Sequence, residues 1–440
     1  MCSVRPPGAS ACVQIKMQRK TEKALLKLLK EEMKPAIGCT EPIAVALASS
    51  TAYQAIGGKL ERIRIIVDPA LFKTSTTVVI PGTNGRGYAL AAMLGALVGD
   101  PSLGLEVLKH VKAESVVKAN SWLKRGIVEV AMEKKGAGVY AEAVVKTNKG
   151  TARTVIKDSH TNIVLVEVNK EVIYKKKEKR KEGRFDITKL SVTDLVNFIK
   201  GIPFEDIKFI LDAVKMNKEL AQEGLTGRFG IGVGANMLSL LEEGKIADDP
   251  ITSAQILVAA ACDARFGGSQ RPAMSIAGSG SHGITASLPV AVIAERKGIE
   301  EEKLARAIAL SFLLTIYIKA YSGRLSAFCG CAVTAAAGAS AGIVYLLGGS
   351  DEQIGHAITN MAADITGIIC DGGNFSCALK TSTGAGAAVR AAFLALRGAV
   401  IPAHIGIVGK DVEVTIKNMG KISSPGMVET DKVLLDIMDS

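Results

Sequence analysis

The chain has 440 residues, of which 48% are hydrophobic and only 4% aromatic. This length is too great for one small core, so we expect two domains packed mainly from small aliphatic side chains. The formal net charge is +11, but much of the excess lies in residues 170–184, whose single aromatic residue argues against nucleic-acid binding. Eight cysteines in such a long chain do not form a disulfide scaffold, and residues 1–17 lack an apolar signal segment, so we expect a cytoplasmic protein.

The first part of the chain mixes helical and strand-like patterns, and the second part is almost entirely helical. We expect helices over 21–33, 43–56, 88–98 and 103–119, and strands over 60–67, 75–80, 127–133, 139–147, 152–158 and 163–168. Further on, helices are expected over 186–201, 204–220 and much of 236–400, then a strand over 411–417 and a short helix over 428–438.

These patterns predict an α+β fold class, with an N-terminal mixed α/β domain and a large all-α C-terminal domain. The short C-terminal tail is expected to return to the first domain. The expected boundaries are a disordered extension at 1–16, the mixed domain at 17–172, a basic linker at 173–190, the helical domain at 191–405 and the tail at 406–440.

One stretch, residues 325–347, resembles a close-packing membrane helix because it lacks charged residues and carries small residues at regular spacing. Ser326, Thr334 and Ser340 interrupt its apolar face, and no other segment forms a comparable span. The favoured interpretation is therefore a buried helix of a helical bundle, and we expect no membrane partner.

Four cysteines lie in two clusters, as Cys329 with Cys331 and as Cys370 with Cys377. On a chain with no sign of secretion, such clusters indicate a metal rather than disulfides. The spacing matches neither a zinc ribbon nor a ferredoxin. A structural zinc, an iron–sulfur cluster and simple buried cysteines therefore all stay open at this level.

Two further segments bring reactive groups to predicted helix starts. Thr40 is the expected N-cap of one helix, which places Cys39 and Glu41 at the positive end of its dipole, where a thiolate is favoured. The turn 277–285 gathers hydroxyls, free backbone amides and His282 before an apolar helix, which suits a carboxylate or a phosphate.

Four motifs resemble the L-cysteine desulfidase family, whose relatives are the iron–sulfur-dependent L-serine dehydratases. They are G-C-T-E-P at 38–42, S-G-S-H-G-I-T-A at 279–286, C-G-C-A-V at 329–333 and C-D-G-x3-S-C-A-L-K at 370–380. The resemblance runs from about Met17 to the C-terminus, and it is closer to the desulfidases than to the dehydratases.

The resemblance implies a [4Fe–4S] cluster held by Cys370, Cys377 and Cys329, with Cys331 as the alternative third ligand, and one iron left open. It also implies Cys39 as the catalytic base. The expected substrate-binding residues are Ser279, Gly280, Ser281, His282, Thr40, Glu41 and His160.

The function that the resemblance implies is β-elimination of L-cysteine to pyruvate, ammonia and hydrogen sulfide. L-serine ammonia-lyase activity is the alternative, followed by a zinc-stabilised or membrane-embedded binding protein. The expected partner is a small amino-acid substrate, with a homodimer as a further option and no nucleic acid.

Overall fold

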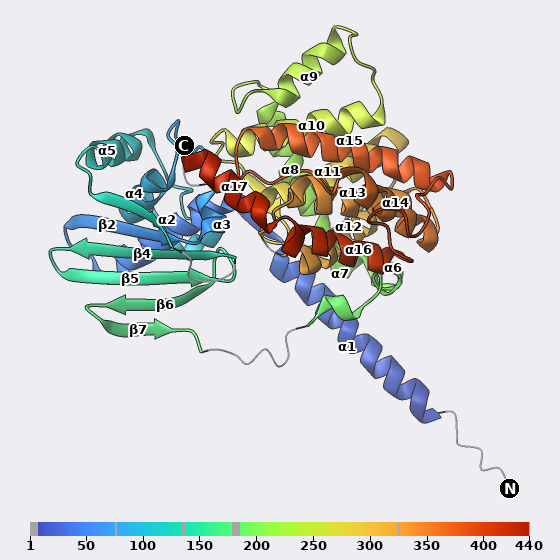
Figure 1. Ribbon diagram of the computed structural model, residues 1–440, viewed down its shortest axis with the longest axis horizontal. Coiled ribbons are helices and arrows are strands. Elements are labelled where there is room, and N and C mark those ends of the chain that lie inside the picture. The colour runs from blue at the N-terminus through green and yellow to red at the C-terminus, as the bar shows by residue number, and fades with distance from the viewer. Residues whose placement is uncertain (1–7, 75–76, 134–137, 178–184, 324, 440) are drawn as a thin grey trace.

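The computed structural model describes residues 8–74, 77–133, 138–177, 185–323 and 325–439. Figure 1 shows two parts side by side, a sheet lobe built on a six-stranded sheet and a larger helical lobe. Each has its own core, and alanine is abundant in both, as the low aromatic content predicts. The α+β fold class is therefore confirmed, while the domain boundaries stay a prediction.

The sheet lobe carries its strands in the order β3-β2-β4-β5-β6-β7. Strand β2 pairs parallel with β3, and every other neighbouring pair in this sheet is antiparallel. Helices α2 and α4 share a core with β2, β4 and β5, so they cover one face of the sheet. The elements are α2 Thr40–Ile56, β2 Leu60–Val67, α3 Pro69–Phe72, α4 Tyr88–Val98, η1 Pro101–Glu106, α5 Ala113–Leu123, β3 Val128–Met132, β4 Tyr140–Thr147, β5 Gly150–Lys157, β6 Ile163–Val168 and β7 Glu171–Lys175.

The helical lobe packs around α10, α11, α12, α13 and α15, and the buried faces of α13 and α15 consist largely of alanine, glycine, serine and threonine. Such small side chains let helices approach closely. The helices are α6 Val192–Gly201, α7 Phe204–Ile207, α8 Leu211–Gly224, α9 Val233–Glu242, α10 Pro250–Phe266, α11 Gly280–Lys297, α12 Glu301–Ser322, α13 Ala336–Leu346, α14 Asp351–Ile365, α15 Ser376–Leu396 and α16 Val412–Lys421. Short helices η2 Ile187–Lys189, η3 Lys208–Ile210, η4 Cys331–Ala335 and η5 Ile422–Gly426 connect or extend them.

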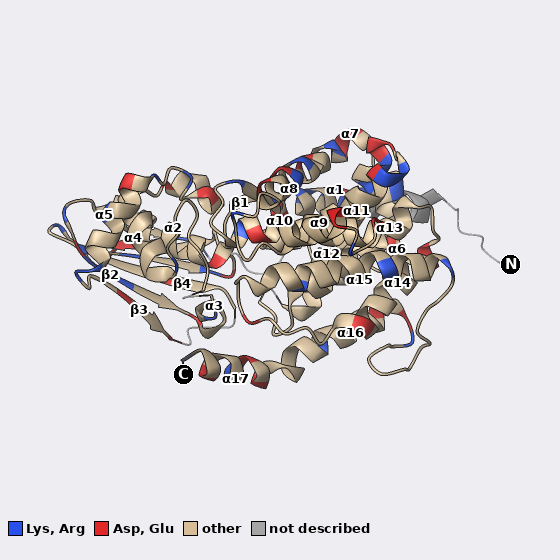
Figure 2. Ribbon diagram, turned by 90° about the horizontal axis from the view of Figure 1, so that it is seen from above, with Lys and Arg blue, Asp and Glu red and all other residues tan. Residues whose placement is uncertain are grey.

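Both ends of the described chain tie the lobes together. Helix α1, Gly8–Glu32, places Leu25 and Leu29 in the core of the helical lobe. Strand β1, Lys34–Ile37, then pairs antiparallel with β8, Pro272–Ser275. Helix α17, Val428–Asp439, points from the helical lobe toward the sheet lobe (Figure 2).

The tail and the N-terminus differ from the sequence predictions. The predicted strand at 411–417 is wrong, because Asp411 caps a helix there and buried residues recur at helical spacing in α16. Residues 1–7 of the predicted disordered extension lie outside the described residues, whereas residues 8–16 form the first turns of α1.

Three local predictions in the sheet lobe also need correction. Residues 75–76 of the predicted strand 75–80 lie outside the described part, and the rest forms only an isolated bridge between Val79 and Arg86. The predicted helix 103–119 is two elements, η1 and α5. Cys39, not Thr40, is the N-cap of α2, so Thr40 is the first residue of the helix itself.

Strand β7 was not predicted, and residues 178–184 of the basic run lie outside the described residues.

Among the described residues, α12 is the one helix long and apolar enough to cross a membrane by length and composition, so the expectation that no segment besides 325–347 forms such a span is wrong. Of its most apolar window, 78% is buried inside the protein, as expected for the central helix of a bundle. The stretch singled out in the sequence, 325–347, contains the shorter apolar helix Cys331–Leu346, which is also packed in the core.

Candidate active site

A pocket of about 90 Å³ lies where the two lobes meet, several times the ~10–15 Å³ that one water requires. Its wall includes these residues singled out in the sequence: Cys39, Glu41, His160, Ser279, His282, Cys329, Cys331, Cys370 and Cys377. Thr40, Gly280 and Ser281 are adjacent in the chain but do not line the wall. Tertiary structure thus brings four separate motifs to one cavity.

A short antiparallel bridge joins the two cysteine clusters. Phe328 and Ile369 form the bridge, and it is closed by the hydrogen bonds Cys329 N–H to Ile368 O (2.7 Å) and Cys370 N–H to Ala327 O (2.8 Å). Cys329 and Cys370 therefore lie diagonally across this bridge, one residue to either side of the Phe328–Ile369 pair, despite the distance between them in sequence.

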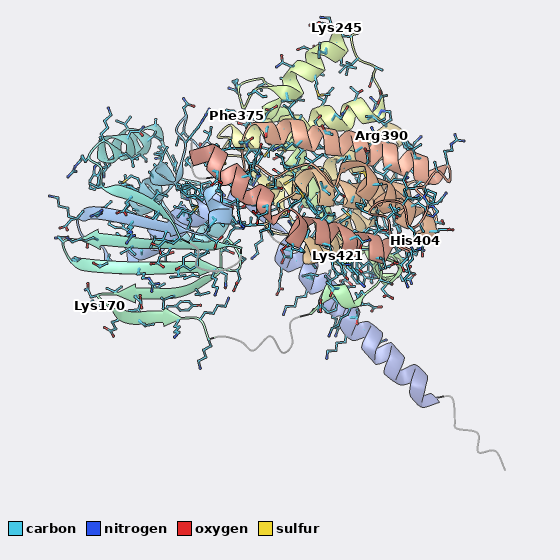
Figure 3. All side chains as sticks on the ribbon, viewed as in Figure 1. Lys170, Lys245, Phe375, Arg390, His404 and Lys421 are labelled. Carbon is cyan, nitrogen blue, oxygen red and sulfur yellow. The ribbon has the colours of Figure 1, made fainter. Side chains whose placement is uncertain are left out.

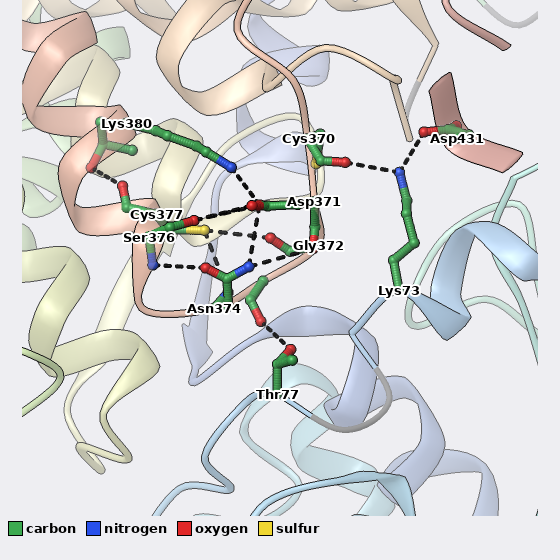
Figure 4. A network of polar contacts seen from close by, with 12 residues as sticks. Lys73, Thr77, Cys370, Asp371, Gly372, Asn374, Ser376, Cys377, Lys380 and Asp431 are labelled. Atoms are coloured by element: carbon green, nitrogen blue, oxygen red, sulfur yellow. Dashed lines mark hydrogen bonds and ion pairs between the residues drawn. The ribbon is translucent and has the colours of Figure 1, made fainter. Parts of the chain in front are cut away.

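We call residues 370–377 the cysteine loop. Within the helical lobe, its conformation is fixed by contacts of its own residue Asp371 (Figure 4). The Asp371 carboxylate pairs with Lys380 and accepts a hydrogen bond from the Asn374 amide at 3.2 Å. Asn374 in turn accepts the Ser376 N–H at 2.7 Å, and its own N–H points at Cys377 Sγ at 3.5 Å. This turn fixes Cys377 at the start of α15.

The sheet lobe holds the same loop from the other side. Lys73 Nζ donates to Cys370 O at 3.2 Å and pairs with Asp431 of α17 at 2.8 Å (Figure 4). Thr77 Oγ1 donates to Gly373 O at 2.9 Å. The Arg86 guanidinium lies 4.8 Å from the ring centroid of Phe375, a side chain labelled in Figure 3. The loop is therefore clamped between the lobes.

The donor set suits a thiolate-bound metal group. Burial raises the pKa of Cys370 and Cys377, and the Cys329 charge raises both further. The side-chain hydrogen bond with Cys331 is the largest cause that raises the pKa of Cys329, and burial is the second. The Cys331 side chain itself is only half-buried. A cationic metal group would relieve this mutual repulsion, and cysteine thiolates are the ligands of both zinc and iron–sulfur centres. In the described part of the chain, no three His, Cys, Asp or Glu side chains converge closely enough to hold a single metal ion.

Cys39 lies against the cysteine loop. A Cβ atom at Gly373 would lie only 2.7 Å from Cys39 Sγ, so glycine is required for this approach. The Cys39 thiol donates to Glu41 Oε2 at 2.7 Å, and Glu41 Oε1 lies 3.9 Å from His160 Nε2. Burial and the Glu41 charge raise the pKa of Cys39 well above its usual value. This direction is opposite to the one expected from the helix N-terminus, because burial and a nearby carboxylate outweigh the dipole.

Glu41 is the acceptor in this arrangement. Burial alone would raise its pKa, but the His160 charge and the hydrogen bond from Cys39 outweigh burial, so the pKa of Glu41 is lowered. Glu41 is therefore a carboxylate beside a protonated thiol, and it is placed to take the thiol proton.

His282 sits in the first turn of α11 and faces the pocket with one ring nitrogen. Its Nδ1 lies 3.2 Å from Ile276 O, where it acts as a donor, which leaves Nε2 as an acceptor. Burial and the Lys319 charge lower the pKa of His282 to about 3, so the ring is neutral. A Cβ at Gly330 would lie 2.7 Å from Nε2, which shows that the ring reaches the cysteine pair.

Four cations of the wall were not predicted as site residues from the sequence, namely Lys73, Arg265, Lys319 and Lys380. Lys380 closes the quoted C-D-G motif, so its signal was present in the sequence. The other three come from three different helices or their ends, and no local pattern distinguishes them from surface cations. Burial is what sets them apart, since Lys73, Arg265 and Lys319 are 4%, 2% and 6% exposed.

Comparison with known proteins identifies relatives along most of the chain. Residues 102–436 match the family model described as the serine dehydratase alpha chain. A UPF0597 protein of Clostridium botulinum (strain Okra / Type B1) is 46% identical over 426 residues, which cover 95% of this chain and 98% of that protein. A UPF0597 protein of Clostridium tetani (strain Massachusetts / E88) is 41% identical over 421 residues, with 95% and 98% covered.

Proposed function

We infer that this chain, which belongs to the serine dehydratase alpha chain family, is an iron–sulfur-dependent lyase that eliminates the β-substituent of a small amino acid. The proposed reaction is the desulfidation of L-cysteine to pyruvate, ammonia and hydrogen sulfide. The observation that carries this proposal is the meeting of Cys39, the cysteine pair and the cysteine loop around one pocket.

Cys329, Cys370 and Cys377 are the proposed ligands of a [4Fe–4S] cluster. Cys329 is preferred to Cys331 because its backbone N–H is hydrogen-bonded to Ile368, two residues before the cysteine loop, and its side chain is buried. A cluster held by three protein thiolates would supply a Lewis-acidic iron that polarises the substrate.

Cys39 is the proposed base for the Cα proton. The thiol first passes its proton to the Glu41 carboxylate, which accepts its hydrogen bond at 2.7 Å. The thiolate then removes the Cα proton, the freed electron pair forms the Cα–Cβ double bond, and the Cβ–S bond breaks with its electrons leaving on sulfur. The aminoacrylate product tautomerises to an imine, and water hydrolyses the imine to pyruvate and ammonia.

The start of α11 is proposed to position the substrate. His282 is neutral and presents an acceptor nitrogen, so it suits a hydrogen bond from the substrate amino group. Ser279, the N-cap of α11, lines the pocket beside it. His160 acts through Glu41, whose charge it stabilises.

L-serine is the second candidate substrate, favoured by the description of the matching family model. The two reactions share the Cα proton transfer and differ in the leaving group, which is hydrosulfide from cysteine and hydroxide from serine. A small amino acid as the partner and a cytoplasmic location belong to the same proposal.

Anaerobic reconstitution with iron and sulfide, followed by turnover of L-cysteine and L-serine side by side, tests the proposal. Brown protein that releases sulfide and pyruvate from cysteine is expected. Cys39→Ala should stay brown and lose turnover, whereas Cys370→Ala and Cys377→Ala should stay colourless. Wild-type protein that takes up no iron would refute the cluster, and faster pyruvate release from serine would favour the second substrate.

A further inference from the structure

Arg265 is a buried cation whose hydrogen-bonding capacity is largely unused. It lies in the last turn of α10 and is 2% exposed, among the largest fully buried side chains of the described chain. Its Nη1 donates to Ser281 Oγ at 2.7 Å, but Nε and Nη2 are buried without a hydrogen-bond partner among the described residues. Leaving such donors unpaired is costly, and burying a charge without a counter-ion costs more.

Two of the other cations of the pocket wall form ion pairs within the protein, and the third is hydrogen-bonded to a hydroxyl. Lys73 pairs with Asp431, and Lys380 pairs with Asp371. Lys319 donates to Ser326 Oγ at 3.2 Å. In the part of the chain that the structure describes, no carboxylate forms an ion pair with Arg265, although the Arg265 charge contributes to the lowered pKa of Glu41. The guanidinium therefore has room for one anion that the protein does not supply.

The position of Arg265 is also unfavourable for the folded protein by itself. The guanidinium lies at the N-terminus of α11, since a Cβ at Gly280 would be 2.6 Å from Arg265 Nε. The start of an 18-residue helix carries partial positive charge and unpaired backbone N–H groups. A buried cation at this end repels the helix dipole, and both attract the same kind of ligand, an anion.

We propose that Arg265, together with the N-terminus of α11, binds the α-carboxylate of the amino-acid substrate. The planar fork of an arginine matches a carboxylate with two parallel hydrogen bonds, and Nε with Nη2 forms one edge of that fork. This inference rests on the proposed function for the identity of the substrate. It assigns substrate recognition to a residue outside the four motifs and explains why the pocket carries an unpaired guanidinium.

Binding of two non-reacting ligands tests the assignment. L-alanine keeps the α-carboxylate and the α-amino group but has no leaving group, and L-alaninamide replaces the carboxylate with a neutral amide. Calorimetric titration of the iron-loaded protein, prepared anaerobically, should give a clear preference for L-alanine. Arg265→Gln should weaken L-alanine binding by at least about 30-fold, or about 2 kcal/mol at 1.4 kcal/mol per tenfold, and should change L-alaninamide binding little. Arg265→Lys should retain part of the preference, because it keeps the charge and loses the fork.

A matched control separates binding from structure. The Arg306 guanidinium, in the same lobe, is satisfied by Glu302 and by the carbonyls of Ile199 and Ile202. Arg306→Gln should lower the melting temperature and leave the ligand preference unchanged. Arg265→Gln removes a buried cation that has no ion-paired carboxylate among the described residues, so it should lower the melting temperature less than Arg306→Gln does.

Each result of these titrations either supports or overturns the role of Arg265 in carboxylate binding. A wild-type protein without carboxylate preference, or an Arg265→Gln variant that keeps it, overturns the assignment. If Arg265→Gln does not fold, the preference in Arg265→Lys decides, and an unchanged preference there overturns it. Loss of the preference in a protein that turns over neither cysteine nor serine would uphold the carboxylate site and refute the proposed function. Unchanged turnover of cysteine in Arg265→Gln would uphold the proposed function and refute the carboxylate site.

Discussion

Replacing Gly373 by alanine tests the contact between Cys39 and the cysteine loop. The new Cβ would lie 2.7 Å from Cys39 Sγ, 3.1 Å from Phe266 Cε1 and 3.2 Å from Val78 Cγ2. Comfortable carbon contacts are about 3.5–4.0 Å, so the thiol has to move by about 1 Å. The site is enclosed on three sides, and overpacking of this kind costs about 1–3 kcal/mol of stability.

The expected functional loss is larger than the loss of stability. A displacement of about 1 Å between reacting groups can lower a rate by about 100-fold. Gly373→Ala should therefore bind iron at the wild-type level, unfold at lower urea concentration and turn over its substrate about 100-fold more slowly. Iron content, urea denaturation and pyruvate release measure the three effects separately.

Gly367→Ala is the matched control, because a Cβ there meets nothing within 4 Å and the residue lies six positions before Gly373 in the same segment. It should keep wild-type stability and turnover. If Gly373→Ala also turned over substrate at the wild-type rate, the role assigned to Cys39 beside the loop would be wrong. A loss of iron would instead mean that the substitution disrupts the ligand loop.

Three further predictions concern the ligands, the pH dependence and the packing. Cys329→Ala should abolish iron uptake while Cys331→Ala retains it, as measured by iron content; the reverse result would make Cys331 the third ligand. Burial and the Lys319 charge lower the pKa of His282 from 6.5 to about 3. Between pH 3 and 6.5 the His282 ring is therefore protonated in the unfolded chain and neutral in the folded protein. The free energy of unfolding should therefore fall as pH drops below 6.5, by about 2 kcal/mol at pH 5, and His282→Asn should flatten this slope in urea titrations. Gly224→Ala should cost more than about 2 kcal/mol, because its Cβ would lie 1.8 Å from a carbonyl of α10, whereas Gly201→Ala, with open space at the end of α6, should be neutral or slightly stabilising.

The fold class and most of the regular elements could be predicted from local patterns. Strands β2 and β6 and helix α4 have the predicted bounds, because period-two alternation or an unbroken apolar run is a strong signal. The strand predicted at 411–417 failed because Asp411 and the burial of Ile416 and Met419 favour a helix packed on α12 and α14. Alternating residues alone could not show that packing.

The candidate site divides in the same way. Its cysteines and His282 lie in short motifs whose residue types are unusual, so the sequence by itself determined which thiols and which helix starts are candidate site groups. Arg265 and Lys319 lie in ordinary helical patterns, and their significance depends on burial and on what faces them. Only the tertiary structure decided that the motifs share one pocket, that Cys39 is protonated beside Glu41, and that one guanidinium is left without a counter-ion. These properties arise from desolvation and from contacts between segments far apart in the chain, which no local pattern encodes.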